Sequence, residues 1–386
     1  MGDDAERVTA ATAAVTVPRG FGPPPGTILF DKYRVESLLG LGGTGVVVKA
    51  TELDTDEHVA IKLLRDDVHV DAETELRLLR EAGAAVRLRS VHAAKIRDVG
   101  SHEGQPFMVM ELLEGMDLGR LLTANQRLDR EFAVELVLQA CDALAEAHGI
   151  GIIHRDIKPS NLFVTWLADG KTCTKVLDFG ISKSPQAAEM IITQRASVLG
   201  TPAYMSPEQM RSATAVDPRT DVWSLGTVLY EMVEGRAAFQ AASYPEMCIM
   251  VSTEDPPPMV HMPELQDIVR RCLAKEPSAR YGTVAELANA LVPFARDPMA
   301  ARSRVPRMYR LVGKQAPFVT DQHAAVMPEM EPVPIVRAGA IAPTSSARLV
   351  VSTPPQPRGQ RTMTIAIVVI VTLAVGLAIV FGTGLK

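Results

Sequence analysis

Residues 33–62 contain short runs of β-branched residues separated by glycine- or aspartate-containing turns, and this pattern predicts strands. Val46–Val48 and Val59–Ile61 are two such runs, as in a meander of β-hairpins. Over 71–89 the apolar residues recur at helical spacing. The same period dominates from about residue 128 onward, for example over 132–147 and 263–273. The pattern therefore predicts a small β-rich lobe followed by a larger helical lobe, within a folded block over 31–295.

Two segments fall outside this periodic pattern. Residues 1–30 are rich in Ala, Thr, Gly and Pro, and we expect them to be disordered because they bury little apolar surface. Residues 296–361 contain ten prolines and only two aromatic residues, Tyr309 and Phe318. Proline-rich composition of this kind predicts a flexible linker.

An apolar run from Ile365 to Phe381 contains no charged residue and predicts a transmembrane helix over 362–382, followed by a short tail, 383–386. The 19 residues Met363–Phe381, at about 1.5 Å per residue, span roughly 28 Å, close to the hydrocarbon thickness of a bilayer. The alternative, a buried globular helix of this length, would normally show a polar face. Arginines precede the run and only Lys386 follows it, so the positive-inside bias predicts a single-pass protein of the inner (cytoplasmic) membrane with its folded block in the cytoplasm.

Composition narrows the class of protein further. Of 386 residues, 47% are apolar and 22% are charged, and 40 basic against 45 acidic residues give a net charge of −5. This balance argues against a nucleic-acid partner. The four cysteines lie far apart, without a CxxC pair, which excludes a zinc ribbon or disulfide scaffold and suits a reducing cytosol. The acidic N-terminus lacks the apolar core of a signal peptide.

The glycine-rich loop, Gly40-Leu41-Gly42-Gly43-Thr44-Gly45-Val46-Val47, contains the pattern GxGxxGxV. A dinucleotide site requires a helix directly after the last glycine, whereas the sequence here continues as a strand. A Walker loop requires Gly-Lys-Ser/Thr at its end, and Gly45 is followed by valine. Two interpretations remain at this point: a flexible flap whose backbone amides approach phosphates, and an ordinary tight hairpin.

Lys62 ends the apolar strand Val59-Ala60-Ile61. A lysine that grips phosphates needs a carboxylate to keep it charged and oriented. Glu81, within the predicted helix over 71–89, is the favoured partner, with Glu73 and Glu75 as rivals. An exposed lysine at a strand edge is the alternative interpretation.

The most specific pattern is His154-Arg155-Asp156-Ile157-Lys158-Pro159-Ser160-Asn161, which we call the catalytic loop. It is followed by a second acid after an apolar run, in Val176-Leu177-Asp178-Phe179-Gly180. A hard divalent cation that bridges nucleotide phosphates prefers oxygen ligands from few protein groups, and Asn161 and Asp178 meet that need. Asp156 then serves to accept a hydroxyl proton, and Lys158 neutralises the transferring phosphoryl group.

With these motifs in this order, residues 33–295 resemble a bacterial eukaryotic-like (Hanks-type) Ser/Thr protein kinase. The resemblance implies an α+β, bilobal protein kinase fold with a β-rich N-lobe and a helical C-lobe, here joined to the C-terminal transmembrane helix. The stretch from Gly200 to Glu208 resembles the end of an activation segment. By the same resemblance, Asp221 begins a buried helix that supports the catalytic loop, and Arg280 pairs with Glu208.

The resemblance also implies the site residues. Lys62, Glu81, Asp156 and Lys158 are catalytic, and Asn161 and Asp178 bind metal. Met110 is the gatekeeper, the Glu111 carbonyl and Leu113 amide meet the adenine edge, and Phe163 lies beneath it. The ATP-binding set is Gly40, Leu41, Gly42, Gly43, Thr44, Gly45, Val47, Ala60, Lys62, Met110, Glu111, Leu113 and Phe163. Two departures from the family pattern are Thr44, where an aromatic residue is common, and Ser206, where alanine is usual.

Activation by phosphorylation is expected between Asp178 and Glu208. Arg155 directly precedes Asp156, and an arginine there needs a counter-charge to order the segment. Thr193 and Ser197 are the candidates, and the family resemblance favours Thr193. Unmodified solvated hydroxyls are the alternative.

The leading hypothesis is therefore an ATP-dependent Ser/Thr kinase that uses Mg²⁺, with Mn²⁺ as a substitute, and acts on protein substrates. A homodimer would allow autophosphorylation in trans. The first alternative is a membrane-tethered pseudokinase scaffold that binds nucleotide without transfer, although such proteins usually lose the lysine, the base or a metal ligand. The second is a small-molecule (aminoglycoside-type) phosphotransferase, which should lack the Ser206-Pro207-Glu208 segment end.

Overall fold

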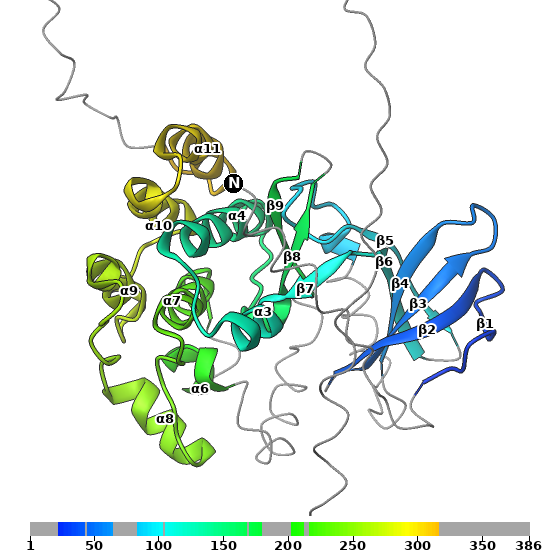
Figure 1. Cartoon of the computed structure of the whole chain (residues 1–386), viewed down its shortest axis with the longest axis horizontal. Coiled ribbons are helices and arrows are strands. Elements are labelled where there is room, and N and C mark those ends of the chain that lie inside the picture. The colour runs from blue at the N-terminus through cyan, green and yellow to red at the C-terminus, as the bar shows by residue number, and fades with distance from the viewer. Residues whose placement is uncertain are drawn as a thin grey trace, which may run out of the picture. The chain divides into compact units, whose positions relative to one another are not determined.

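The computed structural model describes residues 22–42, 45–64, 83–102, 105–167, 170–179, 202–211 and 216–315 (Figure 1). All of them lie within one unit, residues 1–319. Strands dominate before residue 118 and helices dominate after it. The predicted β-rich lobe followed by a larger helical lobe is confirmed.

The N-lobe is an antiparallel sheet of six strands in the order β1-β2-β3-β4-β6-β5. Their bounds are β1 Ile28–Leu29, β2 Tyr33–Gly42, β3 Gly45–Glu52, β4 His58–Leu64, β5 Ile96–His102 and β6 Gln105–Glu111. Alternating side chains of these strands fill one core, which contains Tyr33, Val35, Val48, Val59, Ile61 and Val109. The sequence prediction of a meander over 33–62 is confirmed.

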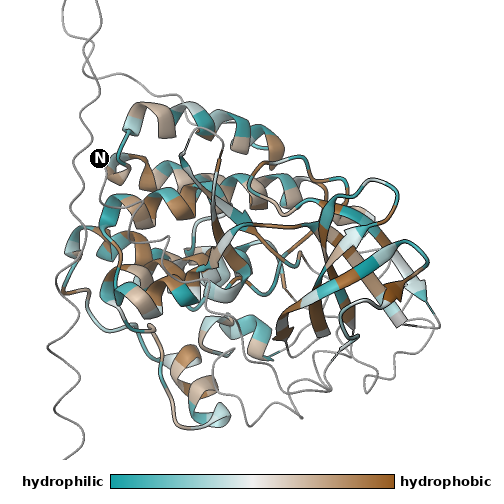
Figure 2. Cartoon of the chain, turned by 45° about the vertical axis from the view of Figure 1, so that its right-hand side comes forward, coloured by the Kyte–Doolittle hydropathy of each residue, from teal (hydrophilic) through white to brown (hydrophobic). Residues whose placement is uncertain are grey.

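The C-lobe consists mainly of helices, whose hydrophobic and hydrophilic stretches alternate in Figure 2. They are α3 Leu118–Asn125, α4 Arg130–Gly149, α6 Pro207–Arg211, α7 Arg219–Glu234, α8 Tyr244–Thr253, α9 Gln266–Cys272, α10 Val284–Leu291 and α11 Pro298–Leu311. Short 3-10 turns are η1 Pro159–Asn161, η2 Pro202–Tyr204, η3 Pro263–Leu265, η4 Pro277–Ala279 and η5 Val292–Phe294. Five of these helices have an N-cap residue whose side chain accepts a backbone N–H of the first turn: Asp117, Asp129, Ser243, Thr283 and Asp297.

A second sheet joins the two lobes. It contains β7 Gly115–Asp117, β8 Leu162–Trp166 and β9 Thr172–Val176, in the order β7-β8-β9. β8 and β9 are antiparallel, with Leu162 opposite Val176. The catalytic loop therefore enters this sheet at the same edge at which the chain leaves it toward Asp178.

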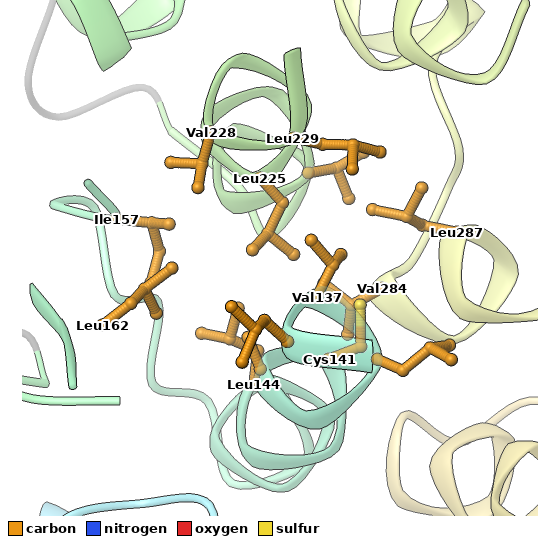
Figure 3. Close-up of a cluster of buried hydrophobic side chains, with 14 of the residues drawn as sticks. Val137, Cys141, Leu144, Ile157, Leu162, Leu225, Val228, Leu229, Val284 and Leu287 are labelled. Carbon is orange, nitrogen blue, oxygen red and sulfur yellow. The ribbon is translucent and has the colours of Figure 1, made fainter. Parts of the chain in front are cut away.

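The core of the C-lobe anchors the catalytic loop. Ile157 and Leu162 are each 1% exposed, and both point into the cluster between α4 and α7 (Figure 3). The other labelled members of that cluster are Val137, Cys141, Leu144, Leu225, Val228, Leu229, Val284 and Leu287. Apolar side chains on both sides of η1 thus hold the polar loop residues between them in place.

Strand β1, Ile28–Leu29, lies within the segment 1–30 that was predicted to be disordered, so that prediction is wrong at the end of the segment. β1 pairs with β2, Gly26 donates its amide to the Val35 carbonyl at 2.8 Å, and the ring of Phe30 stacks on Phe107 with centroids 3.7 Å apart. These contacts attach the end of a proline-rich stretch, which composition alone indicated as unstructured, to the N-lobe sheet. Residues 1–21 lie outside the described residues.

The predicted linker over 296–361 is wrong at its start, because α11 occupies Pro298–Leu311. Proline is tolerated in the first turn of a helix, where its missing N–H would have no intrahelical partner. The buried side chains of α11 recur at helical spacing, and they are Ala301, Val305, Met308 and Tyr309. The rest of the predicted linker, from residue 316 on, lies outside the described residues.

Within the described ranges, no helix is long and apolar enough to cross a membrane. The predicted transmembrane helix over 362–382 lies outside those ranges. It stays a prediction.

Candidate functional site

Lys62 and Asp178 meet between the two lobes. Lys62 lies on β4 and is 7% exposed, and its Nζ is 2.8 Å from the Asp178 Oδ2. Burying an amine in this position requires a counter-charge, which Asp178 supplies. The sequence predicted a carboxylate partner for Lys62 but favoured Glu81, and that residue lies outside the described residues. Asp178 is therefore the partner that the described structure shows.

The catalytic loop brings its three polar residues together. Lys158 Nζ lies 2.9 Å from Asp156 Oδ2. The Asn161 amide group donates to the Asp156 carbonyl oxygen at 2.7 Å and to Asp156 Oδ2 at 3.1 Å. These contacts orient the Asp156 carboxylate beside a lysine, as the predicted roles of Asp156 and Lys158 require.

The two candidate metal ligands lie at one edge of the small sheet. Asn161 directly precedes β8, Asp178 follows β9 by two residues, and Leu177 donates its amide to the Asn161 carbonyl at 2.9 Å. Because Asn161 uses its amide N–H groups on Asp156, the side-chain oxygen is what it offers a ligand. Oxygen donors from one amide and one carboxylate suit a hard divalent cation that completes its shell with phosphate and water. Among the described residues, no group of three or more His, Cys, Asp or Glu side chains is placed to hold a metal.

Two residues of this site have left-handed backbone, with φ of +64° at Arg155 and +57° at Asp178. Such conformations are uncommon for residues other than glycine and persist where surrounding contacts enforce them. His154 supplies one such contact: its Nε2 lies 2.7 Å from the Leu177 carbonyl oxygen, and its ring packs edge-on against Phe179. The loop and the chain around Asp178 thus hold one another in place.

Asp221, at the start of α7, is the buried support of the catalytic loop. It is 0% exposed and accepts the backbone N–H groups of His154 and Arg155, each at 2.9 Å. His148 Nε2 lies 2.8 Å from the same carboxylate. Burial raises the pKa of Asp221, but the hydrogen bonds and charges of His148 and His154 together outweigh it, so the pKa lies below its ordinary value of 3.8. The carboxylate is therefore charged where the loop needs an acceptor.

The predicted nucleotide-binding residues of the N-lobe gather around the strands that lead to Lys62. In the glycine-rich loop, Gly40, Leu41 and Gly42 pair with Val47, Val46 and Gly45 across β2 and β3, which confirms the strand–turn–strand form. The register breaks between Leu38 and Gly40, and such a bulge bends and twists a strand. Gly43 and Thr44, at the tip, lie outside the described residues.

The remaining predicted adenine contacts lie on both sheets and on the chain between them. Ala60 of β4 is opposite Met110 of β6, and Glu111 ends β6. Leu113 follows in the connection to β7, and Phe163 is on β8, opposite Asp117. The fold thus places the N-lobe part of the predicted adenine site, Ala60 and Met110, and its C-lobe part, Phe163, on the two sheets that the chain at Leu113 connects.

Glu111 has a partner that the sequence did not indicate. Its carboxylate is 2.8 Å from Lys175 Nζ and accepts the Lys95 backbone N–H at 2.8 Å. The side chain of Glu111 therefore ties β6 to β9, while its backbone remains the predicted adenine contact.

The end of the predicted activation segment is held by a buried ion pair. Arg280 has no exposed side-chain surface, and its two terminal nitrogens donate to the Glu208 carboxylate at 2.6 and 2.8 Å. Burial raises the pKa of Glu208, but the hydrogen bond and charge of Arg280 outweigh it, so the pKa lies below its ordinary value of 4.5. The predicted pairing of these residues is confirmed. Thr193 and Ser197, the candidate phosphorylation sites, lie outside the described residues.

The departure at Ser206 is accommodated by a buried polar cluster. Ser206 is 0% exposed, and its hydroxyl contacts Thr220 and Gln209. Gln209 in turn donates to the Arg155 carbonyl at 2.8 Å. A serine at this position therefore joins the segment end to the catalytic loop through hydrogen bonds that alanine could not make.

A protein kinase domain model matches residues 33–292, more than half of the chain. The chain belongs to the protein kinase domain family. This membership confirms the bilobal kinase fold expected from the motifs. Use of ATP and of a divalent metal is general in the family.

The curated relatives that this chain matches include Ser/Thr protein kinases of bacteria. The chain is 33% identical over 333 residues to the Ser/Thr-protein kinase pkn3 of Myxococcus xanthus, covering 84% of this chain and 58% of that protein. It is 37% identical over 268 residues to PknB of Mycolicibacterium smegmatis, covering 67% and 42%. The chain thus spans about half the length of the curated relatives it matches. The solved PknI kinase domain of Mycobacterium tuberculosis matches with a TM-score of 0.56 at 24% identity, over 71% of this chain and all of that one, which shows the shared fold.

Sequence reasoning missed several residues that position the kinase site. His148, Gln209 and Lys175 contact site residues that are 73, 54 and 64 positions away in sequence. Each is an ordinary polar residue on a helix or strand. Only for His148 was there a local signal, since it is a polar residue near the end of an apolar helix that leads into the catalytic loop.

Proposed function

We propose that this chain is an active Ser/Thr protein kinase that transfers the γ-phosphate of ATP to protein hydroxyls. The observation that carries the proposal is the complete polar set around Asp156. Lys62 pairs with Asp178, and Lys158 and Asn161 converge on Asp156. A pseudokinase scaffold usually lacks one of these groups. The segment end at Glu208, held by Arg280, disfavours a small-molecule phosphotransferase.

The proposed roles follow from charge and position. Lys62 holds phosphate oxygens of ATP in a fixed place, and Lys158 offsets the charge that develops on the transferring phosphoryl group. Asp156 orients the substrate hydroxyl and accepts its proton. The glycine-rich loop, with its backbone amides, covers the phosphates. Positioning and electrostatics thus supply most of the catalysis.

Asn161 and Asp178 would hold a magnesium ion, which neutralises and orients the nucleotide phosphates when bound; Mn²⁺ has the same oxygen preference. Lys62 would then contact nucleotide phosphates in place of Asp178, and Asp178 would contact the metal. No nucleic-acid partner is proposed, in keeping with the net charge of −5.

The direct test is an incubation of the purified full-length chain with Mg²⁺, labelled ATP and a generic basic protein. We expect label on serine and threonine of the protein, with none on tyrosine. Nucleotide binding without transfer would favour the scaffold. Transfer to aminoglycosides in place of protein would favour the small-molecule enzyme.

We further propose activation by autophosphorylation at Thr193, with Ser197 as the alternative site. A phosphate adds nearly two negative charges, and Arg155 of the catalytic loop is the proposed cation that receives them. Two copies in a homodimer would phosphorylate one another. Thr193→Ala is expected to lower kcat about tenfold through loss of an ordered segment, and Ser197→Ala is the matched control. Active protein that carries no phosphate at either residue in mass spectrometry would contradict the proposal.

A single C-terminal membrane span with a cytoplasmic kinase domain is the proposed localisation. The support is the uncharged run from Ile365 to Phe381, with arginines before it. Deleting residues 362–386 is expected to move the kinase from the membrane pellet to the supernatant, with activity retained. Retention of the truncated chain on membranes after a high-salt wash would contradict the anchor. So would digestion of the kinase domain by protease added outside intact cells.

A further inference from the structure

Helix α11 lies beyond the matched family domain but packs as part of the C-lobe. The family model ends at residue 292, and α11 covers Pro298–Leu311. It lies beside α10 and α4 (Figure 1). Four of its apolar side chains are at most 5% exposed: Ala301, Val305, Met308 and Tyr309. A helix with this much buried surface is an integral part of the fold.

Ion pairs join α11 and the residue just before its N-cap to α4 along its length. They are Arg296 to Glu131 at 3.4 Å, Arg304 to Glu135 at 2.8 Å, and Arg307 to Asp142. Residue numbers rise together on both sides, so the two helices run in the same direction. The last of these pairs is the least exposed on its acidic side, because the Asp142 side chain is 9% exposed.

The ends of the two helices lie in close contact. A Cβ atom at Gly149, the last residue of α4, would lie less than 3.0 Å from the carbonyl oxygen of Leu311, the last residue of α11. Real Cβ atoms essentially never make so short a contact with backbone. Gly149 is therefore required for this approach, although glycine is otherwise unfavourable inside a helix.

α4 also holds the segment through which the chain re-enters the N-lobe. The Asp142 carboxylate that pairs with Arg307 accepts the Ser90 hydroxyl at 2.7 Å. One turn further along α4, Glu146 accepts the backbone N–H groups of Arg89 and Ser90 at 3.0 and 2.6 Å. One carboxylate oxygen of Asp142 thus contacts Arg307 of α11, and the other contacts Ser90 in the segment at residues 89–92.

That segment in turn positions the chain next to Asp178. Val176 donates its amide to the His92 carbonyl at 2.7 Å, and Ala94 donates to the Val176 carbonyl at 3.0 Å. Asp178 follows Val176 by two residues and contacts Lys62. A continuous set of polar contacts therefore runs from α11 through α4 and residues 89–94 to the candidate metal ligand.

We propose that α11 is a positioning element of the catalytic domain and that Arg307 acts through Asp142 and Ser90 to set the position of Asp178. Its kinetic consequence rests on the proposed kinase function. Its structural consequence does not.

Hydrogen–deuterium exchange on the full-length chain without nucleotide tests the structural part. Arg307→Ala is expected to speed amide exchange at Ser90 and Val176 about tenfold, because the half-exposed arginine no longer holds the buried Asp142 carboxylate. Arg307→Lys should restore most of the protection. The control is Arg302→Ala, which removes an exposed arginine from the same helix and should leave exchange at Ser90 and Val176 unchanged.

Gly149→Ala provides an independent variant. It favours the helical state of α4 by residue type but forces the Leu311 backbone away. We expect it to reproduce the faster exchange at Ser90 and Val176 with all of the ion-pairing side chains still present. Exchange that rises evenly over the whole C-lobe in both variants would show a merely stabilising helix and would overturn the proposal.

The kinetic part is measured on the same proteins. Arg307→Ala is expected to raise the KM for magnesium-ATP about fivefold and to change kcat less, because misplacement of Asp178 weakens nucleotide binding. Unchanged exchange and unchanged KM in an active Arg307→Ala protein would overturn the coupling alone. If the wild-type chain transfers no phosphate and Arg307→Ala still exchanges faster than the wild type at Ser90 and Val176, the proposed function is overturned and the coupling stands.

Discussion

Asp156→Asn is expected to reduce phosphoryl transfer about 10³-fold, since a positioned general base contributes roughly 10²–10⁴ to a rate. The asparagine has the same shape and retains an oxygen that can accept from Asn161. It loses the charge that Lys158 faces at 2.9 Å and the ability to take the substrate proton. The measurement is kcat with a saturating protein substrate and magnesium-ATP.

Two controls separate chemistry from folding in this experiment. Asp98→Asn changes an exposed aspartate on β5 and should leave kcat unchanged. The thermal midpoint and the nucleotide affinity of Asp156→Asn should match those of the wild type, because the charge removed is partly exposed. Undiminished transfer by Asp156→Asn would remove Asp156 from its assigned role.

Arg280→Met is expected to destabilise the C-lobe by about 3–5 kcal/mol, the range seen when one partner of a buried ion pair is removed. Methionine fills similar space but leaves the Glu208 carboxylate without its counter-charge. It also removes donors from the carbonyls of Ala274, Lys275 and Arg219. The measurement is urea unfolding at neutral pH. Arg302→Met, on the exposed face of α11, should stay within about 0.5 kcal/mol of the wild type.

The difference in unfolding free energy between wild type and Arg280→Met is expected to depend on pH in one direction. Because Arg280 lowers the pKa of Glu208 in the folded state, the pair stabilises the protein above the ordinary value of 4.5. That stabilisation is lost as the pH falls through the lower folded value. The gap between wild type and Arg280→Met should therefore narrow in acid. A gap that stays constant from neutral to acidic pH would show that the charge of Glu208 plays no part.

Glu208→Gln and the double variant with Arg280→Met complete a double-mutant cycle for the ion pair. Glu208→Gln should lower the free energy of unfolding less than Arg280→Met does, since the amide can still accept a hydrogen bond from the arginine. The double variant should cost less than the two single variants added together, because the uncompensated charge is absent from it. Strict additivity would contradict a coupled pair.

The sequence alone determined the parts of the site that are local in the chain. The strand–turn–strand form of the glycine-rich loop follows from Val46–Val48 continuing directly after Gly45, and the structure shows that pairing. Asp156, Lys158 and Asn161 lie within six positions, so a short loop ending in a 3-10 turn is enough to bring them together. Hydrophobic periodicity likewise predicted a helix over 132–147, which is α4, although the structure buries α4 on nearly every side from Leu136 to Ala145.

Contacts between distant segments were decided by the tertiary structure. The partner of Lys62 among the described residues is Asp178, which the sequence had assigned to metal. His148, a residue without a motif, supports Asp221 across 73 positions. Periodicity shows which face of a helix is buried but not which helix covers it, and these pairings depend on that packing.

Helix α11 is the clearest case in which the sequence pattern did not show what a segment packs against. Prolines and a scarcity of aromatic residues made residues 296–361 resemble a linker, and composition cannot tell an arginine in water from one that meets an acidic helix. The carboxylates of α4 and the missing side chain at Gly149 supply a surface that fits this segment. A helix of 14 residues is only marginal by itself in water. Its order therefore comes from the apolar and ionic contacts that it makes with α4 and α10, which exist only once those helices have packed.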